Sequence, residues 1–227
     1  DPLWSRGLGD VYKRQLLRSA WLSFRIAAMT ATAAVIIGTW AGYVLGRMGR
    51  FRGFSLYVGM LSAPLVIPEV VLGISLLLMF VELRGSLGWP AENGIFTIWV
   101  GHVTLCMAFV AVVIQTRIRD LDRSLEEAAL DLGATPITVF FKITLPLIAP
   151  ALASAWLLSF TLSLDDVVLA SFLSGPSSST LPMEVFSRVR LGLKPEINAL
   201  ATLFILAVGT CVILANRLQW RKESESK

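Results

Sequence analysis

Long apolar stretches with almost no charged residues alternate with short polar segments along most of this chain of 227 residues. Five stretches are long enough to cross a bilayer as helices, which takes about 20 residues each. They are predicted at residues 26–45, 54–81, 95–115, 145–164 and 197–215. Open strands cannot satisfy their backbone groups in lipid, and no alternating pattern indicates a barrel. The pattern therefore predicts an all-α membrane protein built as a multi-span helical bundle.

Composition supports a membrane protein and argues against the main alternatives. The chain is 55% hydrophobic and only 16% charged, with a mean hydropathy of +0.70, whereas soluble domains carry about 25% charged residues. The net charge of +4 could suggest nucleic acid. The basic residues, however, flank apolar stretches, as in membrane proteins, and no nucleic-acid partner is expected. Cys106 and Cys211 both lie inside apolar stretches, and with a single histidine they predict no disulfide and no metal site.

The distribution of basic residues predicts an orientation. One set lies after the first span, between the third and fourth spans, and after the fifth: Arg47, Arg50, Arg52, Arg117, Arg119, Arg123, Lys142, Arg217, Arg221, Lys222 and Lys227. The opposite ends carry fewer: Arg84, Arg188, Arg190 and Lys194. The positive-inside rule places the first set, and with it the C-terminus, in the cytoplasm. The flank before the first span disagrees, because it is rich in basic residues but falls outside by helix count.

Residues 1–15 do not read as the start of this protein. They contain no methionine, no signal-peptide core and no periodic pattern. We interpret them as a non-native segment of cloning or read-derived origin and leave them out of the fold prediction. The alternative is a natural cytoplasmic tail that precedes a lost helix.

The polar segment between the third and fourth spans is predicted to form two short helices. Ser124 and Glu127 have the spacing of a capping box at a helix start. Gly133 stands where a left-handed residue would end that helix, and Thr135 followed by Pro136 predicts the start of a second one. Pro146 is predicted to fix the point at which the chain re-enters the membrane.

The same segment carries a longer signature, made of Glu127-Ala128-Ala129, Gly133, Ile143 and Leu145-Pro146. A capped linker would explain the capping pattern alone, but the full string is far more specific. It resembles the signature of the integral-membrane permease subunits of bacterial ABC importers. By that resemblance, these seven residues within 121–146 couple the membrane spans to a cytoplasmic ATPase dimer.

Other segments narrow the resemblance. Residues 67–77, 163–166 and 194–203 are similar to the permeases of spermidine/putrescine importers, and Gly88-Trp89-Pro90 and Phe140-Phe141 favour the putrescine type. The resemblance covers residues 16–221 and implies a type I ABC importer permease fold (MetI-like), followed by a cytoplasmic tail at 222–227. It also implies a multi-pass protein of the bacterial inner membrane. Its partners would be a second permease, the ATPase dimer and a periplasmic polyamine-binding protein, with no cofactor.

Permeases of this type usually have six spans, so the family's first helix is expected to be missing before residue 16. Restoring it would place the N-terminus in the cytoplasm and remove the charge conflict described above. No P-loop motif is present in the chain. The chain is therefore expected to be no enzyme, and ATP hydrolysis would belong to the partner. The inferred role is mechanical, with the spans rocking between inward-open and outward-open states.

Four ionisable residues within or near the predicted spans are candidates for the substrate path: Glu69, His102, Asp165 and Asp166. Such residues are costly in a membrane and suggest function. All are expected in the outer half, where carboxylates would attract a polycation. There are structural alternatives: the aspartates can cap a helix end, the histidine can serve helix packing, and Glu69 can pair with a partner subunit.

Two further features concern the spans themselves. The second predicted span is long for a single crossing, and Pro64 and Pro68 remove backbone donors one turn apart, so a kink or break is expected there. Small residues in the first span, including Ala27, Ala31 and Gly38, predict a helix-packing face.

Three rival functions stay open from the sequence. The first is an ABC permease for another solute, such as a cation, iron or an oxyanion. The second is a transporter or channel driven by an ion gradient, which would leave the signature at 127–146 without a purpose. The third is a truncated fragment that inserts into the membrane but does not transport.

Overall fold

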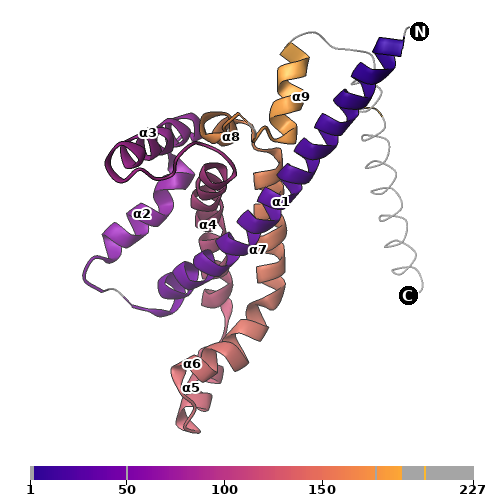
Figure 1. The fold of residues 1–227 in the computed structure, drawn as a ribbon. Coiled ribbons are helices and arrows are strands. Elements are labelled where there is room, and N and C mark those ends of the chain that lie inside the picture. The colour runs from indigo at the N-terminus through magenta and orange to yellow at the C-terminus, as the bar shows by residue number, and fades with distance from the viewer. Residues whose placement is uncertain (1–2, 50, 177, 191–201, 203–227) are drawn as a thin grey trace, which may run out of the picture. The chain divides into compact units, whose positions relative to one another are not determined.

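The computed structural model describes residues 3–49, 51–176, 178–190 and 202, with side chains from residue 14 onward. All regular elements among these residues are helical, as predicted. They are α1 (Leu3–Arg47), α2 (Phe54–Val66), α3 (Glu69–Leu87), α4 (Ile95–Asp120), α5 (Ser124–Asp131), α6 (Pro136–Val139), the π-helix η1 (Phe140–Thr144), α7 (Leu145–Asp165), α8 (Val168–Leu173) and α9 (Leu181–Arg190) (Figure 1). The chain divides into two compact units, Asp1–Glu184 and Val185–Lys227, and the core and candidate site both lie in the first.

Four helical segments among the described residues are long and apolar enough to cross a membrane. They are Arg14–Arg47, Glu69–Leu87, Ile95–Asp120 and Pro136–Asp165. They confirm the first, third and fourth predicted spans, with helices longer than the apolar patterns suggested. Apart from residue 202, the predicted fifth span at 197–215 lies outside the described residues.

The second predicted span is broken into two helices. Ile67 and Pro68 both adopt extended conformations between α2 and α3. The reason is local: a residue before proline is driven away from the helical region, and Pro68 cannot donate to the helical ladder. A single helix over 54–81 is therefore wrong, whereas the predicted break is confirmed. The helix α2 has only 13 residues, so α3 alone reaches spanning length.

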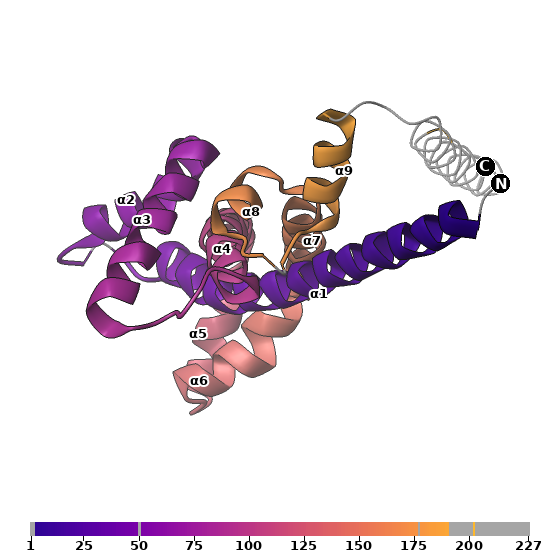
Figure 2. The same cartoon turned by 45° about the horizontal axis from the view of Figure 1, so that its top comes forward.

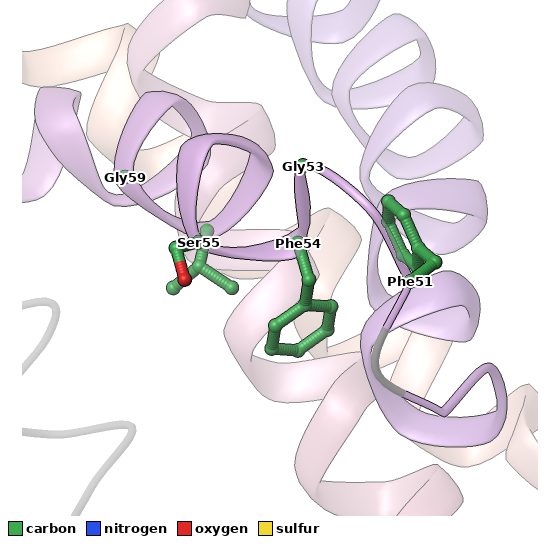
Figure 3. Close-up of a pocket in the computed structure, with 6 residues that line it drawn as sticks. Phe51, Gly53, Phe54, Ser55 and Gly59 are labelled. Atoms are coloured by element: carbon green, nitrogen blue, oxygen red, sulfur yellow. The ribbon is translucent and has the colours of Figure 1, made fainter.

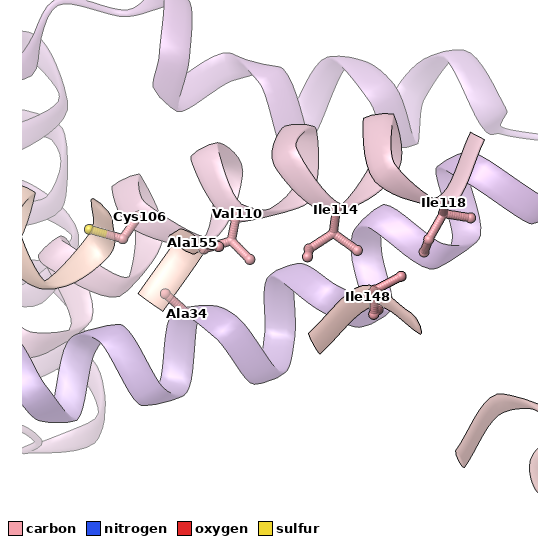
Figure 4. Close-up of a cluster of buried hydrophobic side chains, with 7 residues drawn as sticks. All are labelled: Ala34, Cys106, Val110, Ile114, Ile118, Ile148 and Ala155. Atoms are coloured by element: carbon pink, nitrogen blue, oxygen red, sulfur yellow. The ribbon is translucent and has the colours of Figure 1, made fainter. Parts of the chain in front are cut away.

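The main core forms where α1, α4 and α7 pack together, which both views show (Figure 1, Figure 2). Its buried residues are Ala34 from α1, Cys106, Val110, Ile114 and Ile118 from α4, and Ile148 and Ala155 from α7 (Figure 4). Isoleucine and valine of α4 fill the space opposite alanines of the other two helices. Large side chains against small ones allow close packing of helices in a membrane protein.

The small-residue face of α1 does pack as predicted. Ala27, Ala31 and Ala34 are fully buried. The face continues through Gly42, where an added Cβ would lie 2.7 Å from the carbonyl oxygen of Ala111 on α4. Glycine at this position therefore lets the two helix backbones approach more closely than any side chain would allow.

The short helix α8 packs against α3 and α4 at the end of the bundle away from α5 and α6 (Figure 1). Leu169 and Leu173 are fully buried there, and the Thr97 hydroxyl of α4 donates to the Leu173 carbonyl at 2.6 Å. Arg84 at the end of α3 donates to Asn93 at 2.7 Å and to the Pro90 carbonyl at 3.0 Å. These bonds hold the α3–α4 loop over the same end.

Helix α1 begins at Leu3 and continues without interruption past residue 15, where the sequence suggested a boundary. The helix therefore contains most of the segment interpreted as non-native. That interpretation, and the domain limits drawn from it, stay predictions.

Candidate functional site

The corner formed by residues 121–146, hereafter the α5–α6 corner, begins with a cap that differs from the predicted one. The Asp122 carboxylate accepts a hydrogen bond from the Ser124 backbone N–H at 2.9 Å, and α5 begins at Ser124 itself. The predicted capping box between Ser124 and Glu127 is therefore wrong, because the aspartate two residues earlier caps the chain as it leaves α4. Hydrogen bonds from the Ser124 backbone and then its side chain lower the pKa of Asp122.

The end of α5 is the turn that the sequence predicted. Gly133 has a φ of 85°. Its N–H donates to the Leu130 carbonyl at 2.9 Å, and the Ala134 N–H donates to the Ala129 carbonyl at 3.0 Å. These two bonds form a Schellman motif, in which a left-handed glycine satisfies carbonyls that the helix leaves free.

The second helix of the corner starts as predicted but does not stay separate. The Thr135 hydroxyl accepts from the Thr138 N–H at 3.3 Å, and Pro136 occupies the first helical position. The four-residue α6 then leads through the π-helix η1 directly into α7. Pro146 therefore lies inside a continuous helical segment and marks no separate re-entry. Since a proline cannot pair with the carbonyl four residues before it, the wider π turn just ahead accommodates it.

The carboxylate that ties the corner to the bundle is Glu126, which sequence reasoning missed. One of its oxygens lies 3.0 Å from Nε of Arg47, the last residue of α1. The other accepts a hydrogen bond from the Thr144 hydroxyl of η1 at 2.8 Å. Nothing in the local sequence separates Glu126 from its neighbour Glu127, because both suit the first turn of a helix. Only the positions of Arg47 and Thr144 in the fold select Glu126.

The seven signature residues are mostly turned outward. Glu127, Ala128, Gly133 and Pro146 are exposed, while Ala129, Ile143 and Leu145 are half-buried. Large apolar side chains are exposed beside them: Leu132 at 90%, Ile137 at 71%, and also Leu125 and Phe141. Exposed apolar side chains of this size are typical of sites that interact with a protein or with a membrane.

Aromatic side chains hold η1 against α1. The Phe140 ring stacks on Trp40 at 4.9 Å between centroids, and the Tyr43 ring meets it edge-on at 5.1 Å. Phe140 is itself buried. Pairs of this kind stabilise by about 0.5–1.5 kcal/mol beyond burial alone. These ring contacts hold the residues just before α7 against α1.

Of the four residues predicted for the substrate path, the structure brings two together. His102 Nδ1 lies 2.7 Å from the Ser163 hydroxyl, and His102 Nε2 lies 3.3 Å from the Asp166 carboxylate. The same carboxylate oxygen accepts the Ala170 N–H at 2.9 Å, so Asp166 caps α8. The side chains of His102 and Asp166 are only 2% and 6% exposed.

The other two path residues stand apart from this pair. Asp165 is exposed at the end of α7, and Glu69 is exposed at the first position of α3 beside the break. Neither has a hydrogen-bond or ion-pair partner within the described part of the chain.

Two surface clefts carry the wrong chemistry for a polycation. The larger, about 730 Å³, lies at the start of α2 and is lined by Phe51, Gly53, Phe54, Ser55, Val58 and Gly59, without a charged residue (Figure 3). The smaller, about 400 Å³, is lined by two arginines of α1, Arg18 and Arg25, against one carboxylate, that of Glu184. The exposed carboxylates of Glu69 and Asp165 are in neither cleft.

Residues 21–223 match the family model described as "Binding-protein-dependent transport system inner membrane component". The chain is 58% identical to the putrescine transport system permease protein PotI of Escherichia coli K12, over 98% of this chain and 80% of that protein. It is 40% identical to the spermidine/putrescine transport system permease protein PotC of the same organism, over 92% of this chain and 76% of that protein.

Solved structures share the fold. A chain of the MetNI methionine ABC transporter in inward-facing conformations aligns with a TM-score of 0.69 at 18% identity, covering 89% of this chain and 94% of that one. A chain of a bacterial ABC transporter involved in import of the acidic polysaccharide alginate aligns with a TM-score of 0.59 at 20% identity, covering 90% and 76%. At such identities the likeness concerns the fold alone.

Proposed function

The chain belongs to the family of binding-protein-dependent transport system inner membrane components, and on that premise we propose that it is a permease subunit of an ATP-driven polyamine importer. It is a multi-pass protein of the inner membrane. The observation that carries the polyamine assignment is the 58% identity to the putrescine permease over 98% of the chain. The 40% identity to a spermidine/putrescine permease supports the same class of substrate.

In this proposal the α5–α6 corner is the surface to which a separate ATPase binds. The exposed apolar side chains of Leu132 and Ile137 would enter a groove of the ATPase, and the exposed Glu127 would meet a polar group there. The family assignment implies an ATPase and a solute-binding protein as partners. A second permease subunit would complete the pore, and ATP hydrolysis would take place in the ATPase dimer.

The connectivity of the helices supports a mechanical role. The corner runs through η1 into α7 as one helical segment, Pro136–Asp165. A displacement of α6 is therefore delivered directly to a spanning helix, without a flexible linker between them. Rocking of α7 with its neighbours would alternate access between the two sides of the membrane.

For the substrate path we propose different roles for the four predicted residues. Glu69 and Asp165 are exposed and free within the described part of the chain, so they can attract a polycation and pair with its ammonium groups. His102 and Asp166 are buried against each other, and their contribution would be indirect, through the placement of α4, α7 and α8 at that end of the path.

The proposed function is tested by reconstituting the chain with a polyamine-importer ATPase, a sister permease and a polyamine-binding protein. Putrescine is expected to stimulate ATP hydrolysis and to accumulate inside vesicles only when all four components are present. Spermidine, sulfate and ferric ion form the comparison panel. Stimulation by sulfate or iron in place of the amines, or uptake without the ATPase, would contradict the proposal.

Removing a path carboxylate should weaken uptake mainly at low putrescine. Glu69→Gln and Asp165→Asn are each expected to raise the KM of uptake about fivefold, with a smaller effect on the maximal rate, since losing about 1 kcal/mol of attraction corresponds to roughly that factor. Glu82→Gln is the matched control, because Glu82 is an exposed carboxylate on the same helix as Glu69. An unchanged KM in both path variants would assign these carboxylates a structural role.

A further inference from the structure

Helix α5 has no apolar anchor of its own. None of its eight residues is buried, and the large side chains of Leu125 and Leu130 are exposed. A short amphipathic helix is normally held in place by its buried face, which α5 lacks. Something other than hydrophobic packing must therefore fix its orientation relative to the spans.

The side chain that fulfils this role is Glu126. Its two carboxylate oxygens are divided between Nε of Arg47 at 3.0 Å and the Thr144 hydroxyl at 2.8 Å. Within the described part of the chain it is the one side chain of α5 that bonds to another helix, since the Ser124 side chain bonds only to the adjacent loop residue Asp122. Arg47 also donates to the Leu121 carbonyl at 3.4 Å, so the guanidinium holds the connection into α5 as well.

The cluster of Arg47, Glu126 and Thr144 joins three separate helices. Arg47 ends α1, Glu126 lies in the first turn of α5, and Thr144 ends η1 where α7 begins. The side chains of Arg47 and Glu126 are only 8% and 16% exposed, and Thr144 is fully buried. An ion pair so shielded from water is weakened little by solvent and salt, and removing one partner leaves the other charge buried and unpaired.

We propose that Glu126 is a positioning residue for transport, held by Arg47 and Thr144 so that α5, α1 and the start of α7 move as one body. The inference rests on the proposed function and deepens it. Glu127 faces outward and is available to the ATPase, whereas its neighbour Glu126 faces inward and passes the displacement of α5 to α1, a helix that the corner does not reach through the chain itself. Without the bonds from Glu126 to Arg47 and Thr144, the surface that binds the ATPase stays intact, but α5 can move independently of α1.

The test uses the assembled transporter with putrescine as probe. The variants are Glu126→Gln, Arg47→Gln, the milder Thr144→Val, and the charge exchange Arg47→Glu with Glu126→Arg. The matched controls are Asp120→Asn and Arg52→Gln, which alter exposed charges nearby that have no partner among the described residues. Two quantities are measured: ATPase captured by the purified permeases, and putrescine transported per ATP hydrolysed.

Each single variant at Glu126 or Arg47 is expected to capture the ATPase at the wild-type level while transport per ATP falls about tenfold, a size typical of coupling between sites. Thr144→Val should give a smaller loss, and the charge exchange should recover most of the transport. The controls should match the wild type.

Three results would overturn the proposal: normal transport per ATP in Glu126→Gln and Arg47→Gln, loss of ATPase capture in parallel with transport, or a charge exchange no better than the single variants. Failure of the proposed function looks different. In that case the wild-type assembly itself shows no putrescine-stimulated ATP hydrolysis.

Discussion

Replacing Gly133 with valine is expected to abolish putrescine-stimulated ATP hydrolysis while the chain still inserts and folds. Gly133 has a φ of 85°, and a β-branched residue in the left-handed region costs about 1–2 kcal/mol or more. An added Cβ would meet nothing within 4 Å, so the whole effect arises from the backbone. The turn can relieve this strain only by giving up the Schellman bonds, and α5 then loses its fixed angle to α6.

Two further substitutions isolate that cause. Gly133→Asn places a side chain in the same open space, but asparagine tolerates the left-handed region, so most of the stimulation should return. Gly53→Val introduces the same strain at another exposed glycine, which has a φ of 89° and no neighbour within 4 Å, but lies outside the corner. Stimulation is measured as the ratio of ATP hydrolysis with and without putrescine. A normal ratio in Gly133→Val would show that coupling does not need this turn.

Replacing Gly42 with alanine is expected to lower the stability of the purified chain by about 3 kcal/mol, near the upper end for overpacked cores. The added Cβ would lie 2.7 Å from the Ala111 carbonyl oxygen and 3.0 Å from the Gln115 backbone nitrogen. These are backbone atoms of α4, which cannot turn aside as the end of a side chain can. The two helices must separate instead, and contacts along the α1–α4 interface are lost.

The control is Gly85→Ala on α3, where an added Cβ would meet nothing within 4 Å. Alanine in a helix interior is better than glycine by about 0.5–1 kcal/mol, so this variant should gain stability. The two substitutions are chemically identical and are predicted to differ in sign. Equilibrium unfolding in detergent measures both, and a Gly42→Ala variant as stable as the wild type would contradict the close α1–α4 contact.

The polar signature was more informative about the family than about the contacts. The string from Glu127 to Pro146 led to the resemblance that the family match confirms, yet it did not indicate which carboxylate ties α5 to the bundle. Glu126 and Glu127 differ by one position, about 100° around the helix. The sequence does not show on which side Arg47 lies, since that residue is 79 positions away from Glu126.

Features that depend on a few neighbouring residues could be predicted without the structure. The apolar runs predicted where helices span, Pro68 predicted the break between α2 and α3, and Gly133 predicted the left-handed turn. In each case the cause is local, because apolar length, the missing proline N–H and the missing glycine Cβ act wherever the residue stands.

Contacts between side chains that are distant in the sequence could be identified only from the tertiary structure. It pairs His102 with Asp166, leaves Asp165 and Glu69 exposed, and selects Glu126 as the link to Arg47. It also requires glycine at position 42, where the backbones of α1 and α4 approach each other closely. These outcomes depend on how α1, α4 and α7 pack, and that packing is set by many side chains together, so no short stretch of sequence contains it.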